Sequence, residues 1–267
     1  MKSIRVVLVA VVLMASGVVT PAWATSWSND QSDLWWNSGE NGWGIQFVHR
    51  GSTIFATMFV YDAMGNPTWY VATMEGTKAT GVVTFTGDLY GTHGPWFGAV
   101  PYNPANFTVA KVGTMTWQKQ SGVPGTLTYS VNGVNVTKSL TRQPIRSDDY
   151  NGTYMAGLHV IASGCFNAAK NGIVDGAGTL TVTQNGSAIS LNFAAGGTNC
   201  TLSGPYSQSG QLGSATGNYS CADGETGTFS TSDMSVSPFA MAGRLSLAST
   251  TTGCQNSGQI GGVRTDQ

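Results

Sequence analysis

The chain has 267 residues, and its 12 basic and 13 acidic side chains make up only 9% of them. Removal of an N-terminal leader that carries Lys2 and Arg5 would leave 10 basic against 13 acidic residues, a net charge of −3. This balance excludes a nucleic-acid-binding protein, because contacts to a phosphate backbone need clustered Lys and Arg. The 36 glycines, together with abundant Ser, Thr and Asn, are typical of turn-rich β-structure.

Residues 1–24 have the pattern of a secretory signal peptide. Lys2 and Arg5 precede an apolar stretch over 6–19, and Ala22-Trp23-Ala24 forms an A-x-A cleavage site. The apolar stretch is shorter than the roughly 20 residues of a membrane span, and no later segment qualifies. We therefore expect the mature chain to begin near Thr25 as a soluble exported protein, periplasmic or extracellular, with no membrane span.

The distribution of Trp and Cys predicts two domains. Every Trp lies at or before Trp117, and every Cys lies at or after Cys165. Between them, residues 142–149 form a polar stretch that contains Pro144, the kind of segment that commonly separates domains. The predicted units are a Trp-rich β-domain over 25–146 and a Cys-containing β-domain over 147–267.

Short β-branched and aromatic runs between turn signals predict an all-β fold. In the first half the expected strands are 44–49, 53–61, 68–74, 82–89, 108–118, 125–131 and 134–141. In the second half they are 179–184, 187–193, 199–207, 214–221, 227–232, 239–248 and 259–264. Asn132-Gly133 and Asn185-Gly186 are strong hairpin signals. Two consecutive antiparallel β-barrels or sandwiches are predicted, the second disulfide-bonded.

The cysteines fit this strand arrangement. Cys200 and Cys221 are symmetric about the turn at Gly210-Gln211, so a simple hairpin places them opposite each other. That leaves Cys165 to pair with Cys254, although four cysteines allow three connectivities. The absence of any C-x-x-C motif argues against zinc or redox chemistry, and structural disulfides are predicted.

The main candidate ligand-binding residues lie in an aromatic run and in the strands that follow it. The run 34–44 reads LWWNSGENGWG, with three Trp and a single Glu. Trp faces can stack on sugar rings or line a site for a flat apolar ligand, and they can equally fill a barrel core. Neighbouring strand residues point to opposite faces, so Trp35 and Trp36 cannot both line one pocket. The predicted ligand-binding residues are Trp35, Trp36, Glu40, Trp43, Trp69 and Trp96.

The catalytic content of the sequence is low. A glycosidase would need a second carboxylate about 5–10 Å from Glu40, and Asp62 and Asp88 are the available acids. The three histidines lack metal-ligand spacing, and no G-x-S-x-G, phosphate-binding loop or other nucleophile motif is present. We therefore predict no cofactor, no metal and no catalytic residue, and no site in the second half. Residues 90–106, rich in Pro and aromatics, are expected to form a binding loop or a packed loop at one barrel end.

The first half resembles a family of uncharacterised exported bacterial β-proteins. The motifs that carry the resemblance occur in one order over about 34–143: Trp35-Trp36-Asn37, Glu40-x-Gly42-Trp43-Gly44, the strand 55–62, Gly65-Asn66-Pro67-Thr68-Trp69, and the strand 127–133. The family tends to have Ser and Trp where this chain has Asn41 and Met58. No activity follows from this resemblance.

Each half also resembles, more weakly, a lipocalin or avidin type of barrel. Each opens with an aromatic strand, at Trp35 or Tyr154, and closes with a strand that ends in Arg142 or Arg264. In such barrels an Arg of the last strand can cover an aromatic ring of the first, which would close one end.

Three functions from different classes are compatible with the sequence. The leading hypothesis is an exported non-catalytic binding protein that holds a carbohydrate or small apolar ligand with the aromatic cluster of the N-terminal domain. The alternatives are a structural or adhesive protein of the cell surface or matrix, and a hydrolase that uses paired carboxylates. The sequence does not determine the oligomeric state.

Overall fold

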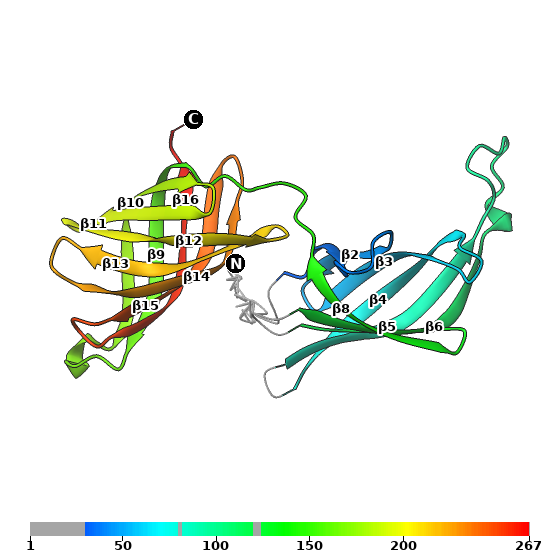
Figure 1. Cartoon of the computed structure of the whole chain (residues 1–267), viewed down its shortest axis with the longest axis horizontal. Helices are drawn as coiled ribbons and strands as arrows, with labels where there is room; N and C mark the ends of the chain where they lie inside the picture. The colour runs from blue at the N-terminus through cyan, green and yellow to red at the C-terminus, as the bar shows by residue number, and fades with distance from the viewer. Residues whose placement is uncertain (1–29, 80–81, 120–123, 267) are drawn as a thin grey trace, which may run out of the picture.

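The computed structural model describes residues 30–79, 82–119 and 124–266, and these residues form an all-β structure (Figure 1). The proposed signal peptide and its cleavage site lie outside the described residues. Strands of the first half are β1 (Asp33–Trp36), β2 (Gly44–Arg50), β3 (Thr53–Tyr61), β4 (Pro67–Ala79), β5 (Val82–His93), β6 (Thr108–Gln118), β7 (Gly125–Val131) and β8 (Val134–Arg142). Strands of the second half are β9 (Gly152–Ser163), β10 (Gly172–Asn185), β11 (Ala188–Ala195), β12 (Thr198–Ser209), β13 (Leu212–Cys221), β14 (Thr226–Val236), β15 (Ala240–Ser249) and β16 (Gln255–Arg264). Two short 3₁₀ turns, η1 (Pro104–Asn106) and η2 (Ala168–Lys170), lie in loops.

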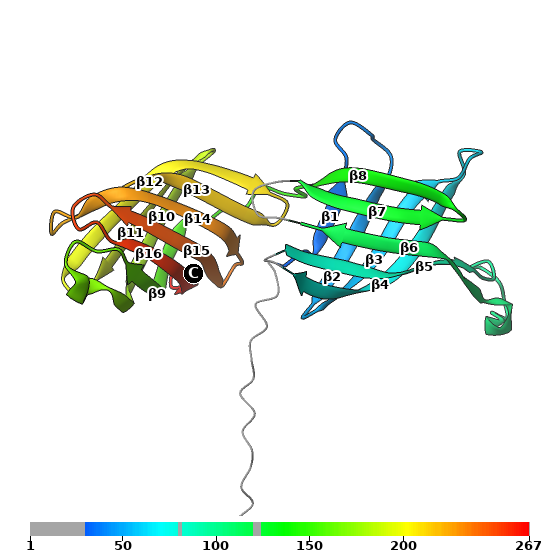
Figure 2. The same ribbon diagram turned by 90° about the horizontal axis from the view of Figure 1, so that it is seen from below.

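The strands form two closed antiparallel barrels, one after the other in the chain (Figure 2). Barrel 1 contains β1 to β8 and closes where β1 pairs with β8; barrel 2 contains β9 to β16 and closes where β9 pairs with β16. Closure joins the first and last strands of each sheet, over two residue pairs in barrel 1 and along the whole of β16 in barrel 2. The predicted fold class is confirmed, and the proposed domain boundary at 146/147 falls in the segment between β8 and β9.

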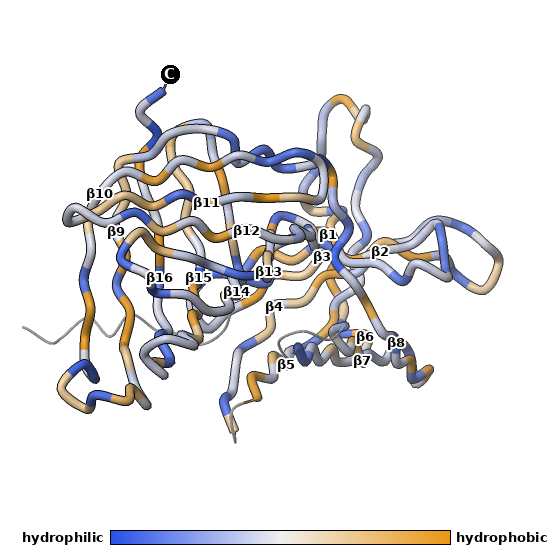
Figure 3. The backbone as a smooth tube through the Cα atoms, turned by 60° about the vertical axis from the view of Figure 1, so that its left-hand side comes forward, coloured by the Kyte–Doolittle hydropathy of each residue, from blue (hydrophilic) through white to orange (hydrophobic). Residues whose placement is uncertain are grey.

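Hydrophobic and hydrophilic positions alternate along many of the strands (Figure 3). Because neighbouring side chains of a strand point to opposite faces, this alternation gives each barrel an interior and an outer wall. The interior of barrel 1 is filled largely by bulky residues. Its most deeply buried side chains are Trp35, Ile45, Phe47, Ile54, Met58, Met74, Phe85, Leu89, Met115 and Trp117. The rings of Trp35, Phe47 and Trp117 contact one another, with centroids 4.7–6.1 Å apart. An eight-stranded barrel is just wide enough for side chains to fill it, and these do so near one end.

The predicted hairpins are present, but two strand segments were not predicted. Asn132 and Gly133 have φ of 49° and 86°, the positive values that a tight two-residue hairpin turn requires. Most of β9 and the part of β10 over 172–178 were missed, because Ala and Gly at many of their positions weaken the β-signal. Pairing of β9 with β16, and of residues 172–178 of β10 with β9, holds these segments in the sheet.

One end of each barrel is closed by an Arg of its last strand. The Arg142 guanidinium lies 4.7 Å from the ring centroid of Trp35, and that of Arg264 lies 5.0 Å from the ring centroid of Tyr154. Arg142 also pairs with Asp33, at 2.9 Å between Nη1 and Oδ2. These are the cation–π contacts expected from the sequence. We call these the closed ends and the opposite ends the mouths.

The two closed ends face each other. The turn between β12 and β13 reaches barrel 1, where the Gln211 backbone N–H donates to Asp33 Oδ2 at 2.9 Å and Gln211 Nε2 donates to Ser32 O at 2.6 Å. Gly210 makes the approach possible: its φ is +61°, and a Cβ there would overlap Asp33 and lie 2.8 Å from Arg142 Cβ. The mouths therefore point away from each other, toward the two ends of the molecule (Figures 1 and 2).

Candidate functional site

The aromatic residues predicted to bind a ligand do not form a single cluster. Trp35 is 1% exposed in the interior of barrel 1, where its Nε1 donates to Gln31 O at 2.9 Å. Trp36 follows it in β1 and points to the other face of the strand, partly buried. Trp35 is thus a core residue beneath Arg142, and only some of the remaining candidates are accessible.

Glu40 and Trp43 lie together at the mouth of barrel 1. Trp43 Nε1 donates to Glu40 Oε2 at 3.0 Å, and Lys138, at an inward-facing position of β8, donates to Glu40 Oε1 at 2.8 Å. These hydrogen bonds, the one from Lys138 above all, lower the pKa of Glu40. A general acid needs the opposite shift, so the arrangement favours a structural ion pair over acid catalysis.

Trp69 and Trp96 are exposed in two other places. Trp69 is on the outer wall of barrel 1, where it pairs with Phe59 across β3 and β4 and is 47% exposed. Trp96 and its neighbour Phe97 are 69% and 91% exposed in the loop between β5 and β6. That loop extends beyond the mouth of barrel 1 (Figure 1), so it is not the packed closure that was one of the two expectations.

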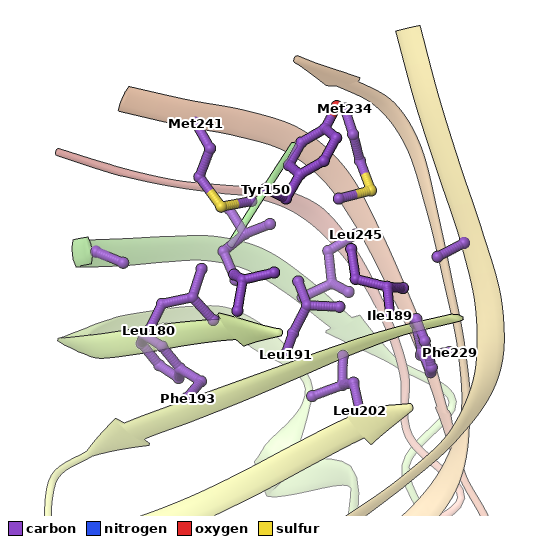
Figure 4. Packing of buried hydrophobic residues seen from close by; sticks show 14 of the residues in the cluster. Tyr150, Leu180, Ile189, Leu191, Phe193, Leu202, Phe229, Met234, Met241 and Leu245 are labelled. Atoms are coloured by element: carbon purple, nitrogen blue, oxygen red, sulfur yellow. The ribbon is translucent and has the colours of Figure 1, made fainter. Parts of the chain in front are cut away.

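A large cavity lies in barrel 2, in the half of the chain for which the sequence predicted no site. Its volume is about 510 Å³, within the range of roughly 300–1,000 Å³ that small-molecule sites occupy. All eight strands of the barrel contribute residues to its wall. The wall is mainly aliphatic and is formed by Leu158, Val160, Leu180, Leu191, Phe193, Leu202, Leu245, Leu247 and Ile260, most of which Figure 4 places within the core cluster.

Larger side chains close the floor of this cavity. Tyr150, Tyr154, Tyr206, Met234 and Met241 belong to the same buried cluster, at the closed end of the barrel. Tyr150 and Tyr206 stack edge-on, with ring centroids 5.6 Å apart. Burial raises the pKa of Tyr150, which therefore stays neutral. The bulky residues are thus confined to the closed end, and the aliphatic walls above them leave space.

Two disulfides frame the mouth of barrel 2. Cys165–Cys254 joins the loop after β9 to the loop before β16, and Cys200–Cys221 joins β12 to β13. Both predicted pairs are present: Cys200–Cys221 was expected from the hairpin register, and Cys165–Cys254 as the remaining pair. They hold the rim of the cavity, and disulfides of this kind form in an oxidising, non-cytoplasmic compartment.

The rim also carries the polar groups of the cavity. Lys170 is the last residue of η2, and Asn171 follows it. Thr252 lies in the loop before β16, and Asn256 lies in β16 itself. All four line the cavity on the side of the mouth where β16, β9 and β10 meet. Glu225 lies on the opposite side and accepts a hydrogen bond from the Tyr219 hydroxyl at 2.9 Å. Burial is the main cause that raises the pKa of Tyr219, to about 12.

The other acids proposed for hydrolysis have structural partners. Asp62 Oδ1 accepts the backbone N–H groups of Met64 and Asn66 in its own turn, and these interactions lower its pKa. Asp88 pairs with Lys111 at 2.7 Å. Within the described ranges, no group of three His, Cys, Asp or Glu side chains could hold a metal ion, and no helix is long and apolar enough to cross a membrane.

A cavity depends on the absence of bulky side chains, so the Trp residues on which the predicted site was based do not indicate it. A signal was present: the inward positions of β10 to β12 carry Leu, Val and Ile, with aromatic residues kept to a few places. That pattern is also compatible with a filled core, so it does not by itself distinguish a cavity from a packed interior.

Comparisons with known proteins identify no relative. No protein-family model matches the chain, and neither a curated protein nor a solved structure matches it. The resemblance of residues 34–143 to a family of exported β-proteins stays a prediction.

Proposed function

We propose that this protein is an exported, non-catalytic binding protein that holds a small apolar ligand inside barrel 2. The observation that carries the proposal is the cavity of about 510 Å³ walled by side chains of all eight strands. Concave, mostly apolar spaces with a few polar groups at one side are the usual form of small-molecule sites. Catalysis has little support, because the candidate acids hold ion pairs or turns.

In this proposal barrel 1 has a supporting role. Its contacts with barrel 2 involve the closed end, through Gln211 and Asp33, so they leave the mouth of the cavity accessible. The bulky interior of barrel 1 near that end, formed around Trp35 and Trp117, offers little room for a ligand there. The ligand-binding role first assigned to the N-terminal aromatic residues therefore moves, in our proposal, to the aliphatic wall of barrel 2.

The test uses N-phenylnaphthylamine, a neutral apolar fluorophore that brightens in apolar surroundings. Leu202 faces the cavity and Ser203, the next residue of β12, faces solvent. We expect Leu202→Trp to fill the cavity and abolish the fluorescence gain, whereas Ser203→Trp keeps it. Equal binding by the parent and Leu202→Trp, both folded by circular dichroism, would place the probe elsewhere and refute the proposal, as would no binding at all.

Export and a natural ligand are tested on protein from its own host. N-terminal sequencing should find a mature chain that begins near Thr25. Native mass spectrometry should show an extra mass that is lost on denaturation. The denatured, unreduced chain should lack four hydrogens relative to its reduced form if both disulfides form.

A structural or adhesive role is the second candidate, favoured by one specific observation. The loop between β5 and β6 exposes Trp96, Phe97 and Val100, the last at 95%, and residues 94–107 contain no charged side chain. Exposed apolar groups of this kind often mark association surfaces. If this role holds, Phe97→Ser should abolish self-association or adhesion in sedimentation and cell-binding assays, without changing binding of N-phenylnaphthylamine.

A further inference from the structure

The mouth of barrel 2 is chemically asymmetric. On the side where β16, β9 and β10 meet, the cavity is lined by Lys170, Asn171, Thr252 and Asn256. The opposite side, four strands around the barrel, has Glu225. A ligand whose apolar part fills the barrel would bring its polar end to one of these two sides.

Hydrogen-bond donors dominate the first side. The Asn171 side-chain oxygen accepts from the Cys165 backbone N–H at 3.1 Å, which leaves its amide N–H groups as donors. The Thr252 hydroxyl is buried and has no partner among the residues that the structure describes. A buried hydroxyl without a partner is costly, and a ligand atom at the mouth would remove that cost.

Lys170 adds a positive charge to these donors. It is the last residue of η2, exposed at the rim, and no acidic side chain of the described ranges forms an ion pair with it. The nearest acid in sequence is Asp175, and its Oδ1 lies 2.6 Å from Nδ1 of His159 on the outer wall. The disulfide Cys165–Cys254 covalently joins the two loops that carry Lys170 and Thr252, so it holds both side chains at the same part of the rim.

Glu225, on the other side of the mouth, already has polar partners. One of its oxygens accepts the Tyr219 hydroxyl, and the turn that carries it is closed by the hydrogen bond from Cys221 N to Glu225 O at 2.8 Å. Apart from the second carboxylate oxygen of Glu225, the polar groups that line the mouth are mostly hydrogen-bond donors, and the positive charge of Lys170 lies on the side away from Glu225. That combination complements a carboxylate.

We propose that the cavity takes an amphipathic carboxylate, with its apolar chain inside barrel 2 and its carboxylate at the donors of Lys170, Asn171, Thr252 and Asn256. This inference rests on the proposed function and names the chemical class of its ligand. A carboxylate and an alcohol of the same chain length would fill the barrel alike and differ only at the rim. Their difference in affinity therefore measures the rim alone.

The experiment measures displacement of N-phenylnaphthylamine by lauric acid, dodecanol and dodecylamine at neutral pH, below the solubility limit of each and below the micelle concentrations of the two ionic compounds. Because a hydrogen bond to a charged group contributes about 1.5–3 kcal/mol, lauric acid should bind roughly tenfold or more tightly than dodecanol. Dodecylamine should bind no better than dodecanol. In Lys170→Gln the preference for the acid should fall severalfold, while the affinity for dodecanol stays unchanged.

Arg244→Gln is the matched control, because it removes a positive charge from the outer wall of the same barrel, where Arg244 pairs with Asp233. It should keep the full preference for lauric acid. Thr252→Val should lower the preference without the change in net charge. Equal affinities for lauric acid and dodecanol, or a preference unaffected by Lys170→Gln and Thr252→Val, would overturn the inference. Either result leaves the apolar cavity supported if the fluorophore binds, whereas failure of the fluorophore itself refutes the proposed function.

Discussion

Replacement of Arg142 by Met should strongly destabilise barrel 1. The side chains of Arg142 and Asp33 are 5% and 6% exposed, and Arg142 Nη1 lies 2.9 Å from Asp33 Oδ2 and 3.0 Å from Ser32 O. Nη2 donates to Asp30 O, and the guanidinium covers Trp35. Removal of one partner of a buried pair leaves an uncompensated charge, at a cost of about 3–5 kcal/mol.

Arg264→Met gives the internal comparison, because Arg264 has the same position in barrel 2. It donates to Asn151 O at 2.7 Å and to the Tyr154 hydroxyl at 2.8 Å, and its ion pair with Asp266 is longer, at 3.8 Å. Arg264 is 18% and Asp266 40% exposed. Solvent screens such a pair, so we expect a loss of only about 1–2 kcal/mol.

Urea unfolding followed by Trp fluorescence isolates barrel 1, since no Trp lies beyond Trp117. Arg142→Met should shift this transition to lower urea, and Arg264→Met should leave it nearly unchanged. The double variant Arg142→Met/Asp33→Asn should lose less than the sum of the single variants, because the buried charge is gone. A loss below about 1 kcal/mol for Arg142→Met, or additive losses in the double variant, would refute the assignment of this pair as a buried charge contact.

Three further predictions concern the barrel contact, a disulfide and an alkaline transition. Gly210→Ala should weaken the contact between the barrels, which small-angle scattering would detect as greater interdomain motion. The control is Gly186→Ala, which has a similar φ of +58° but nothing within 4 Å of the added Cβ, and it should leave the interdomain motion unchanged. Cys165→Ser/Cys254→Ser opens a loop that spans 89 residues and should lower the free energy of unfolding by ~4.6 kcal/mol in the chain-entropy model. Removal of Cys200–Cys221, whose loop spans 21 residues, should cost less, and equal losses in denaturation curves would contradict this. Burial raises the pKa of Tyr219 to about 12 in the folded protein, against ~10 in the unfolded chain. The contribution of this shift to the free energy of unfolding is fully present below pH ~10 and is lost, by about 2–3 kcal/mol, as the pH rises toward the folded value. Tyr219→Phe should reduce this loss in unfolding curves measured from neutral to alkaline pH, and an unchanged pH dependence would count against this prediction.

Much of the fold follows from local sequence. Alternating apolar and polar residues specify strands, and Asn132-Gly133 supplies the positive φ values of a tight hairpin. Once a hairpin is set, its register places Cys200 opposite Cys221, which is the pairing observed. The aromatic residue near the start and the Arg at the end of each half also meet as expected, because closure of the barrel brings the first strand beside the last. These features depend on neighbours in the chain or on strand order alone.

The location of the candidate site depended on tertiary structure. The sequence shows that Trp35 and Trp36 point to opposite faces, but only the closed barrel shows which one enters the core. The cavity of barrel 2 is set by the sum of inward side-chain volumes from eight strands, and those strands span more than 100 residues of the chain. Likewise, the stapled loops bring Lys170 near Thr252, although 82 positions separate them in the sequence. Local patterns determine which face each side chain takes, whereas empty volume and converging donors exist only after distant strands have closed around a common axis.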